Sequence, residues 1–201
     1  MKTPTFLVFI ALAASCYAGE AADFLNHPGK VIETPDFKAM PEKPWQIAKG
    51  KWEAKDGVLT PTPIESEKHV PVLWDVISPK SAVVECEFQL DAAPSIIIGC
   101  DGTKHIGRVS IAPKSARITD DSTENKKEKT AATLLKEEKL DLKKDQWYSA
   151  KFGWKGDKIY AIVDGKELVG QAPLFTTPRS RWWFATAGAH IRNVKVSEGA
   201  P

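Results

Sequence analysis

The sequence predicts an all-β protein, a sandwich of two antiparallel sheets that carries a charged, partly helical insertion. Three observations support this fold class. From Trp45 onward, short segments alternate between apolar and polar residues, as strands with one buried face do. Turn dipeptides such as Asp56-Gly57 separate these segments. A chain of 201 residues without an internal repeat has the size of one sandwich domain.

The first part of the chain, residues 1–18, has the three zones of a secretory signal peptide. Lys2 gives a positive start, an apolar run follows, and small residues form a cleavage site that ends at Ala18. We therefore expect a secreted or periplasmic protein. A lipoprotein anchored through Cys16 is the alternative, although Ala13 stands where a larger aliphatic residue is usual. No later run approaches the roughly 20 apolar residues of a membrane helix, so no membrane span is expected after cleavage.

The remaining chain divides into a lead-in and one domain. Residues 19–44 are rich in proline and weakly patterned, which predicts an extended lead-in, and the sandwich is expected over 45–198. Within it, residues 120–146 are dense in charge and lack strand alternation, so we expect a solvated insertion there, with a binding element as the alternative. A short amphipathic turn of helix in this insertion would use Ala131, Leu134, Leu135 and Leu142.

The clearest strand pairing is expected near the end of the domain. The segments 148–154 and 159–163 flank a turn at Gly156-Asp157, and 166–169 follows after a second turn, which predicts a three-stranded meander. Pairing across the first turn places Trp154 opposite Ile159, so that one face is consistently apolar.

Residues 83–102 are expected to form one hairpin with two distinct faces. The side-chain period of two places Cys86 opposite Cys100 on the buried face. Such a pair either forms a disulfide, favoured by an oxidising compartment, or remains two buried free thiols. A slip of one residue would bury Glu85 and Glu87 without partners, at a cost of several kcal/mol each.

The opposite face of this predicted sheet is polar. It gathers Glu85, Glu87, Gln89, Arg108 and Arg117. On a concave sheet such a face suits a polar, uncharged ligand such as a sugar. On a convex sheet it holds ordinary ion pairs worth under about 1 kcal/mol each. Trp147 is a candidate platform for the apolar side of a sugar ring.

Other residues give weaker signals. Trp74 and one of the adjacent pair Trp182-Trp183 are further platforms, because neighbouring strand residues face opposite ways. Asp101 and His105 share a loop, and we interpret them as a turn aspartate and a surface histidine. No metal-ligand spacing occurs, so neither a metal nor a cofactor is expected. A net charge of +2 with interleaved signs does not favour nucleic acid as a partner.

Five segments occur in an order that resembles a known family. They are PWQIAKGKWEAKDGVL, AVVECEFQLD, GRVSIAP, DQWYSAKFGWKGDKIYAIVDGKEL and WFATAGAHIRNVKV. Over about residues 36–198 the chain resembles the concanavalin A-like, extracytoplasmic 3-keto-disaccharide hydrolase-like domains, often grouped with family 16 glycoside hydrolases. The resemblance implies a jelly-roll sandwich and a role that involves carbohydrate.

The resemblance does not extend to a whole catalytic motif. Family 16 enzymes carry E-x-D-x-x-E on one strand, and here Glu85 and Glu87 match only its first half, since the third acid would fall at Leu90. Residues i and i+2 of a strand lie about 6.6 Å apart, beyond the ~5–5.5 Å of a retaining pair. The sequence therefore favours carbohydrate recognition. The alternatives are a glycoside-processing enzyme with Glu85 and Glu87 as its acid and base, and a non-catalytic structural or protein-interaction module.

Overall fold

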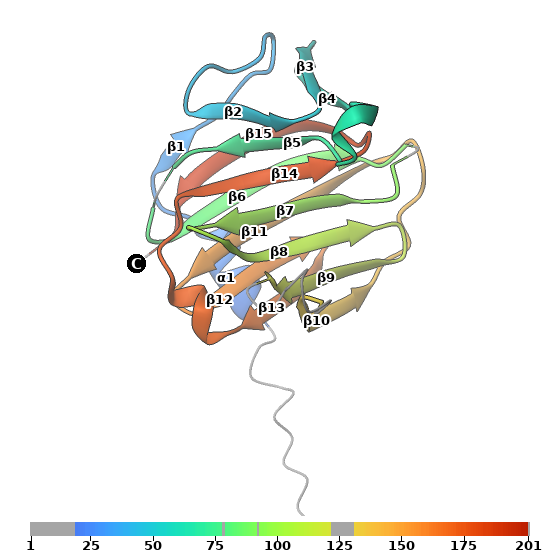
Figure 1. Ribbon diagram of the computed structural model, residues 1–201. Helices are drawn as coiled ribbons and strands as arrows, with labels where there is room; N and C mark the ends of the chain where they lie inside the picture. The colour runs from blue at the N-terminus through green and yellow to red at the C-terminus, as the bar shows by residue number, and fades with distance from the viewer. Residues whose placement is uncertain (1–18, 78, 92, 122–130, 201) are drawn as a thin grey trace, which may run out of the picture.

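The computed structural model describes residues 19–77, 79–91, 93–121 and 131–200. Its strands form two antiparallel sheets that lie face to face (Figure 1). The predicted all-β sandwich is therefore confirmed. The expected signal peptide over 1–18, with Cys16, lies outside the described residues. Within the described part of the chain, none of the helices has the length and apolar character that a membrane crossing needs.

Eight strands of the described chain form the first sheet. In spatial order these are β13 (Lys166–Gln171), β12 (Lys158–Val163), β11 (Trp147–Lys155), β6 (Ala82–Gln89), β15 (His190–Glu198), β4 (Val58–Thr62) and β3 (Lys51–Lys55), with β1 (Val31–Glu33) also paired to β15. The predicted meander is β11, β12 and β13. Its register sets Trp154 opposite Ile159, as expected.

Seven strands of the described chain form the second sheet. Their order is β10 (Thr133–Lys139), β9 (Ser115–Asp120), β8 (His105–Ala112), β7 (Ile96–Asp101), β14 (Arg181–Thr186), β5 (Val72–Asp75) and β2 (Trp45–Lys49). The short 3-10 helices η1 (Glu65–Glu67) and η3 (Pro173–Thr176) lie in the connections. The core between the sheets holds large side chains such as Phe88, Trp154 and Trp182, each fully buried. Burial of a side chain such as Phe88 contributes about 1.5–3 kcal/mol.

The predicted hairpin over 83–102 is wrong, although its two faces are right. The strand β6 pairs with β11 and β15, whereas β7 pairs with β8 and β14 of the other sheet. Cys86 and Cys100 therefore face the same core from different sheets, and both are buried free thiols. The disulfide alternative is wrong as well. Burial raises the pKa of each thiol to about 12, so neither is a reactive nucleophile.

The lead-in is not extended throughout. It contains the helix α1 (Glu20–Asn26), which packs on the outer face of the first sheet (Figure 1). Ala21, Phe24 and Leu25 have the spacing of one helical face, and they cover Val83 and Tyr160. The expectation of an extended segment was wrong here because this short apolar pattern precedes the prolines.

The charged insertion is also different from expectation. Its second half forms the edge strand β10, paired with β9, and not a turn of helix. Arg117 and Glu137 pair across these strands at 2.7 Å. Most β10 side chains are exposed, which is why its pattern lacks the alternation of a half-buried strand. Residues 122–130 lie outside the described residues.

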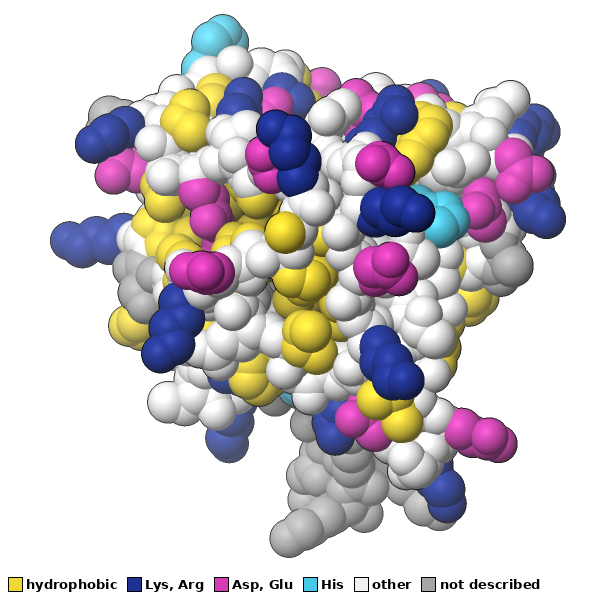
Figure 2. All heavy atoms as spheres, turned by 90° about the horizontal axis from the view of Figure 1, so that it is seen from above, with side chains coloured by type: hydrophobic (Ala, Val, Ile, Leu, Met, Phe, Trp, Pro, Cys, Tyr) yellow, Lys and Arg dark blue, Asp and Glu magenta, His cyan; other side chains and the backbone are white. Residues whose placement is uncertain are grey.

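Charges of both signs are mixed on the side of the molecule seen in Figure 2. Lysine and arginine side chains lie next to aspartates and glutamates there, with apolar side chains between them. This agrees with the interleaved charges of the sequence and with the small net charge of +2. A surface region that carries charges of mainly one sign would therefore be a local feature of the fold and would not follow from the overall composition.

Candidate functional site

The residues of the predicted polar face lie on opposite sides of the sandwich. Glu85, Glu87 and Gln89 are on β6 and Trp147 is beside Gln89 on β11, so these four share the outer face of the first sheet. Arg108 on β8 and Arg117 on β9 belong to the second sheet. The sequence predicted a single polar face because β6 and β7 were expected to pair. In the structure these two strands belong to different sheets, so the predicted residues lie on two separate faces.

On the first sheet, both glutamates are held in ion pairs. Lys151 and Lys195 lie 3.0 and 2.5 Å from Glu85. Burial opposes the ionisation of Glu85, but the hydrogen bonds from these two lysines outweigh it and lower its pKa. Arg192 donates to Glu87 at 2.7 Å and lowers the pKa of that carboxyl too. Two carboxylates kept ionised are poorly suited to donate a proton as a general acid.

Trp147 also has a neighbour on its ring. The guanidinium of Arg192 lies 4.0 Å from the ring centroid of Trp147. The same arginine bonds to Glu87, so an ordered row of partners runs across this part of the first sheet. This arrangement explains these residues through contacts within the protein.

The outer face of the second sheet is hollowed instead. A pocket of about 720 Å³ lies over β2, β5, β14, β7 and β8. Its apolar side includes Ala48, Val72, Ile97 and Ala185, and its polar side includes His105, Arg108 and Arg181. This volume is within the range of ligand-binding pockets, which combine an apolar lining with a few polar groups.

Tryptophan forms the bottom of this pocket. Trp183 on β14 is paired with Gly99 on β7, and a side chain at Gly99 would overlap the Trp183 ring. The missing side chain therefore lets the indole lie against the sheet. Trp74, on β5, is the next aromatic residue across the sheet and carries the guanidinium of Arg181 at 4.0 Å. As predicted for adjacent residues, Trp182 points the other way, into the core.

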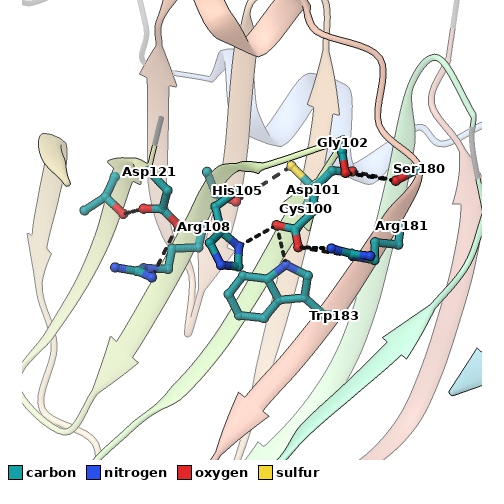
Figure 3. A network of polar contacts seen from close by, with 11 residues as sticks. Cys100, Asp101, Gly102, His105, Arg108, Asp121, Ser180, Arg181 and Trp183 are labelled. Atoms are coloured by element: carbon teal, nitrogen blue, oxygen red, sulfur yellow. Dashed lines mark hydrogen bonds and ion pairs between the residues drawn. The ribbon is translucent and has the colours of Figure 1, made fainter. Parts of the chain in front are cut away.

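Asp101 organises the polar side of the pocket (Figure 3). The indole Nε1 of Trp183 donates to its Oδ1 at 2.9 Å, and Nδ1 of His105 lies 2.9 Å from the same oxygen. Arg181 donates to Oδ2 through Nε and Nη2 at 3.2 and 3.1 Å. The interpretation of Asp101 as a turn aspartate was wrong, because its side chain is only 1% exposed and bonds three partners.

His105 acquires a fixed orientation from this contact. Its bond to Asp101 uses Nδ1 and leaves Nε2 for a ligand. The same hydrogen bond raises the pKa of His105, so the ring stays protonated at higher pH than a free histidine. The ring is oriented by a buried carboxylate and can hold or accept a proton in the pocket.

Arg108 forms a second polar pair in the pocket. Its Nη1 lies 3.3 Å from Oδ2 of Asp121, and the hydroxyl of Thr119 donates to Oδ1 of Asp121 at 2.7 Å. The buried Nε of Arg108 has no hydrogen-bond partner among the described residues. The Arg108 side chain as a whole is 26% exposed, so the rest of its guanidinium is open to a ligand. Arg117 pairs instead with Glu137 on the edge strand and does not line the pocket.

Part of this site could be found from the sequence. Ile97, Gly99 and Asp101 alternate along β7, which places Asp101 on the same outer face as Gly99. Arg108, Trp74 and one of Trp182-Trp183 were expected from the sequence, whereas Val70, Thr103 and Lys104, which line the pocket from connections, carry no such signal. Among the described residues, no cluster of three or more His, Cys, Asp or Glu is arranged to hold a metal ion.

Comparisons with known proteins agree with this architecture. No family profile matches the chain, and no curated protein matches its sequence. The structure is similar to the laminarinase from Rhodothermus marinus, with a TM-score of 0.61, 11% identity and coverage of 86% of this chain and 98% of the other. A galectin-like protein of unknown function from Bacillus subtilis has a TM-score of 0.60, 10% identity and coverage of 87% and 98%.

A third similar structure is the carbohydrate-binding module CBM66 from Bacillus subtilis. Its TM-score is 0.52, with 11% identity and coverage of 77% of this chain and 92% of the module. The fold is a concanavalin A-like jelly-roll sandwich. The fold implied by the sequence resemblance is thus confirmed. At these identities the similarity concerns the fold alone.

Proposed function

We propose that the pocket on the second sheet binds a carbohydrate and that the chain is an extracytoplasmic carbohydrate-recognition domain. The observation that carries the proposal is the combination of a tryptophan floor with fixed polar groups at its edge. Trp183, of which only 5% is exposed, and the partly exposed Trp74 supply the apolar floor, and His105 and Arg108 supply hydrogen-bonding groups beside it. A sugar ring has the matching character, because its C–H groups form an apolar face and its hydroxyl groups a polar rim.

Two further observations support the proposal. Among proteins of similar structure are a laminarinase and a carbohydrate-binding module. The N-terminal pattern over 1–18 supports export of the protein from the cytoplasm, and glycans are accessible to an exported protein. The uncharged sugar ligand was expected for the outer face of the first sheet, whereas this pocket lies on the second sheet and is lined by several cations.

A glycoside-processing enzyme is the second candidate, and one observation favours it. Buried Asp101 orients His105 with one ring nitrogen left for a ligand, which is the arrangement of a general acid or base. Glu85 and Glu87, the candidates from the sequence, lie on the other sheet. An enzyme at the pocket would release new reducing ends from a bound glycan, whereas a recognition domain would leave the glycan intact over the same incubation.

A glycan array tests the recognition proposal directly. We expect binding by the purified protein and at least about tenfold weaker binding after Trp74→Ala, because a pocket aromatic and the stacking partner of Arg181 are lost. Ala48→Trp is a second variant that fills the pocket without removing a contact. Trp147→Ala is the matched change on the first sheet. If only Trp147→Ala weakened binding, the sugar would lie on the first sheet and the proposal would be wrong.

A further inference from the structure

The pocket concentrates positive charge that the rest of the chain does not show. Four lysines and arginines line it together with two histidines: Lys49, His69, Lys104, His105, Arg108 and Arg181. The whole chain has a net charge of only +2, and the side seen in Figure 2 mixes both signs. The charge of the pocket is therefore a local feature and does not reflect the composition.

The acidic groups near the pocket are withdrawn from it. The side chain of Asp121 is 0% exposed and lies against Arg108, and that of Asp101 is 1% exposed and lies against Arg181 and His105. Asp121 thus offsets part of the charge of Arg108, and Asp101 offsets part of the charge of Arg181 and of His105 when that ring is protonated. Asp121 lines the pocket, but its side chain is fully buried and paired with Arg108, and Asp101 is not among the lining residues.

Two cations have no such balance. Lys49 and Lys104 are exposed, both line the pocket, and neither has an ion-pair partner among the described residues. Lys104 is next to His105 in the connection between β7 and β8, and Lys49 lies at the end of β2, so the pocket has cations on two sides. A neutral ligand would displace water from these cations without offering a counter-charge. An anionic group would displace the same water and form an ion pair in its place.

From this charge distribution we propose that the ligand of the pocket is an acidic saccharide, one with carboxylate or sulfate groups on its sugar rings. This inference rests on the proposed function and names its ligand class. The sugar ring contacts Trp183, and its acidic group pairs with Lys104 and Arg108. The guanidinium of Arg108 suits such a group, because its side chain lines the pocket and is 26% exposed.

Matched glycan pairs test the inference. The array carries uronate glycans beside their carboxyl-reduced forms and sulfated glycans beside their desulfated forms. We expect the bound glycans to be acidic and each neutral counterpart to bind at least about tenfold less tightly. The pair that shows the difference tells whether carboxylate or sulfate is recognised. Binding of neutral glycans alone would overturn this inference and leave the proposed function standing, and binding of no glycan would overturn both.

Lysine variants separate a pairing contact from general attraction to polyanions. The double change Lys49→Met and Lys104→Met is expected to weaken binding of the acidic glycan about tenfold. The same change at Lys55 and Lys166, exposed residues outside the pocket lining, is the control and should keep the parent affinity. Equal losses from both doubles, or equally tight binding of a single-stranded oligodeoxynucleotide, would contradict the inference.

Discussion

Replacing Asp101 with alanine is expected to lower the free energy of unfolding by about 3–5 kcal/mol, because it removes one partner of a buried ion pair. The side chain is 1% exposed and accepts hydrogen bonds from Trp183 and Arg181 while it contacts His105. Without it, the Trp183 indole loses its acceptor and Arg181 loses its counter-charge. Urea unfolding monitored by tryptophan fluorescence measures the change.

Asp141 provides a matched comparison. It also contacts two cations, Lys114 and Lys143, but all three side chains are largely exposed. Asp141→Ala should leave the urea midpoint close to that of the parent, since water replaces the lost contacts. Equal midpoints for the parent, Asp101→Ala and Asp141→Ala would show that the Asp101 network does not stabilise the fold.

The second large effect is a dependence of stability on pH. Asp75 on β5 is fully buried, accepts from the Trp182 indole at 2.5 Å and meets Glu33 of β1. Burial, together with the hydrogen bond and charge of Glu33, raises the pKa of Asp75 to about 8. Because this folded-state pKa lies above the unfolded value, the protonated group stabilises the fold at low pH, and that contribution is lost as pH rises through about 8.

We therefore expect the free energy of unfolding to fall between about pH 5 and pH 8, with a slope of up to about 1.4 kcal/mol per pH unit for one proton. His105 contributes in the same direction, since its pKa is also raised. Asp75→Asn removes the titration while keeping an acceptor for Trp182. Unfolding curves at several pH values should be flatter for Asp75→Asn than for the parent. Parallel curves for the two proteins would contradict this account.

The alternation of the sequence predicted which face each residue occupies, but not which strand it pairs with. In 83–102 every assignment to the core held, because a period of two fixes the face of a side chain. The partner strand depends on contacts distant in sequence, such as β6 with β15. A short link between two strands looked like a hairpin, although the chain crosses there from one sheet to the other.

Because strand partners could not be predicted, the residues of the expected binding face were also placed together wrongly. Glu85 and Arg108 were placed together because a hairpin would have joined their strands, and in the structure they face opposite sides of the sandwich. The role of Asp101 depends on Trp183 and Arg181, which are about 80 residues away along the chain. Neither partner is visible in the local pattern around Asp101, so its burial could not be predicted.

The central claim, that the pocket of the second sheet is the ligand site, is tested most directly by the indole N–H signals of the seven tryptophans in an NMR titration with a bound glycan. Assignment by single replacement of tryptophans identifies each signal. We expect the signals of Trp183 and Trp74 to shift, while the signal of Trp147, on the opposite sheet, stays in place. A shift of the Trp147 signal with those of Trp183 and Trp74 unchanged would contradict the account.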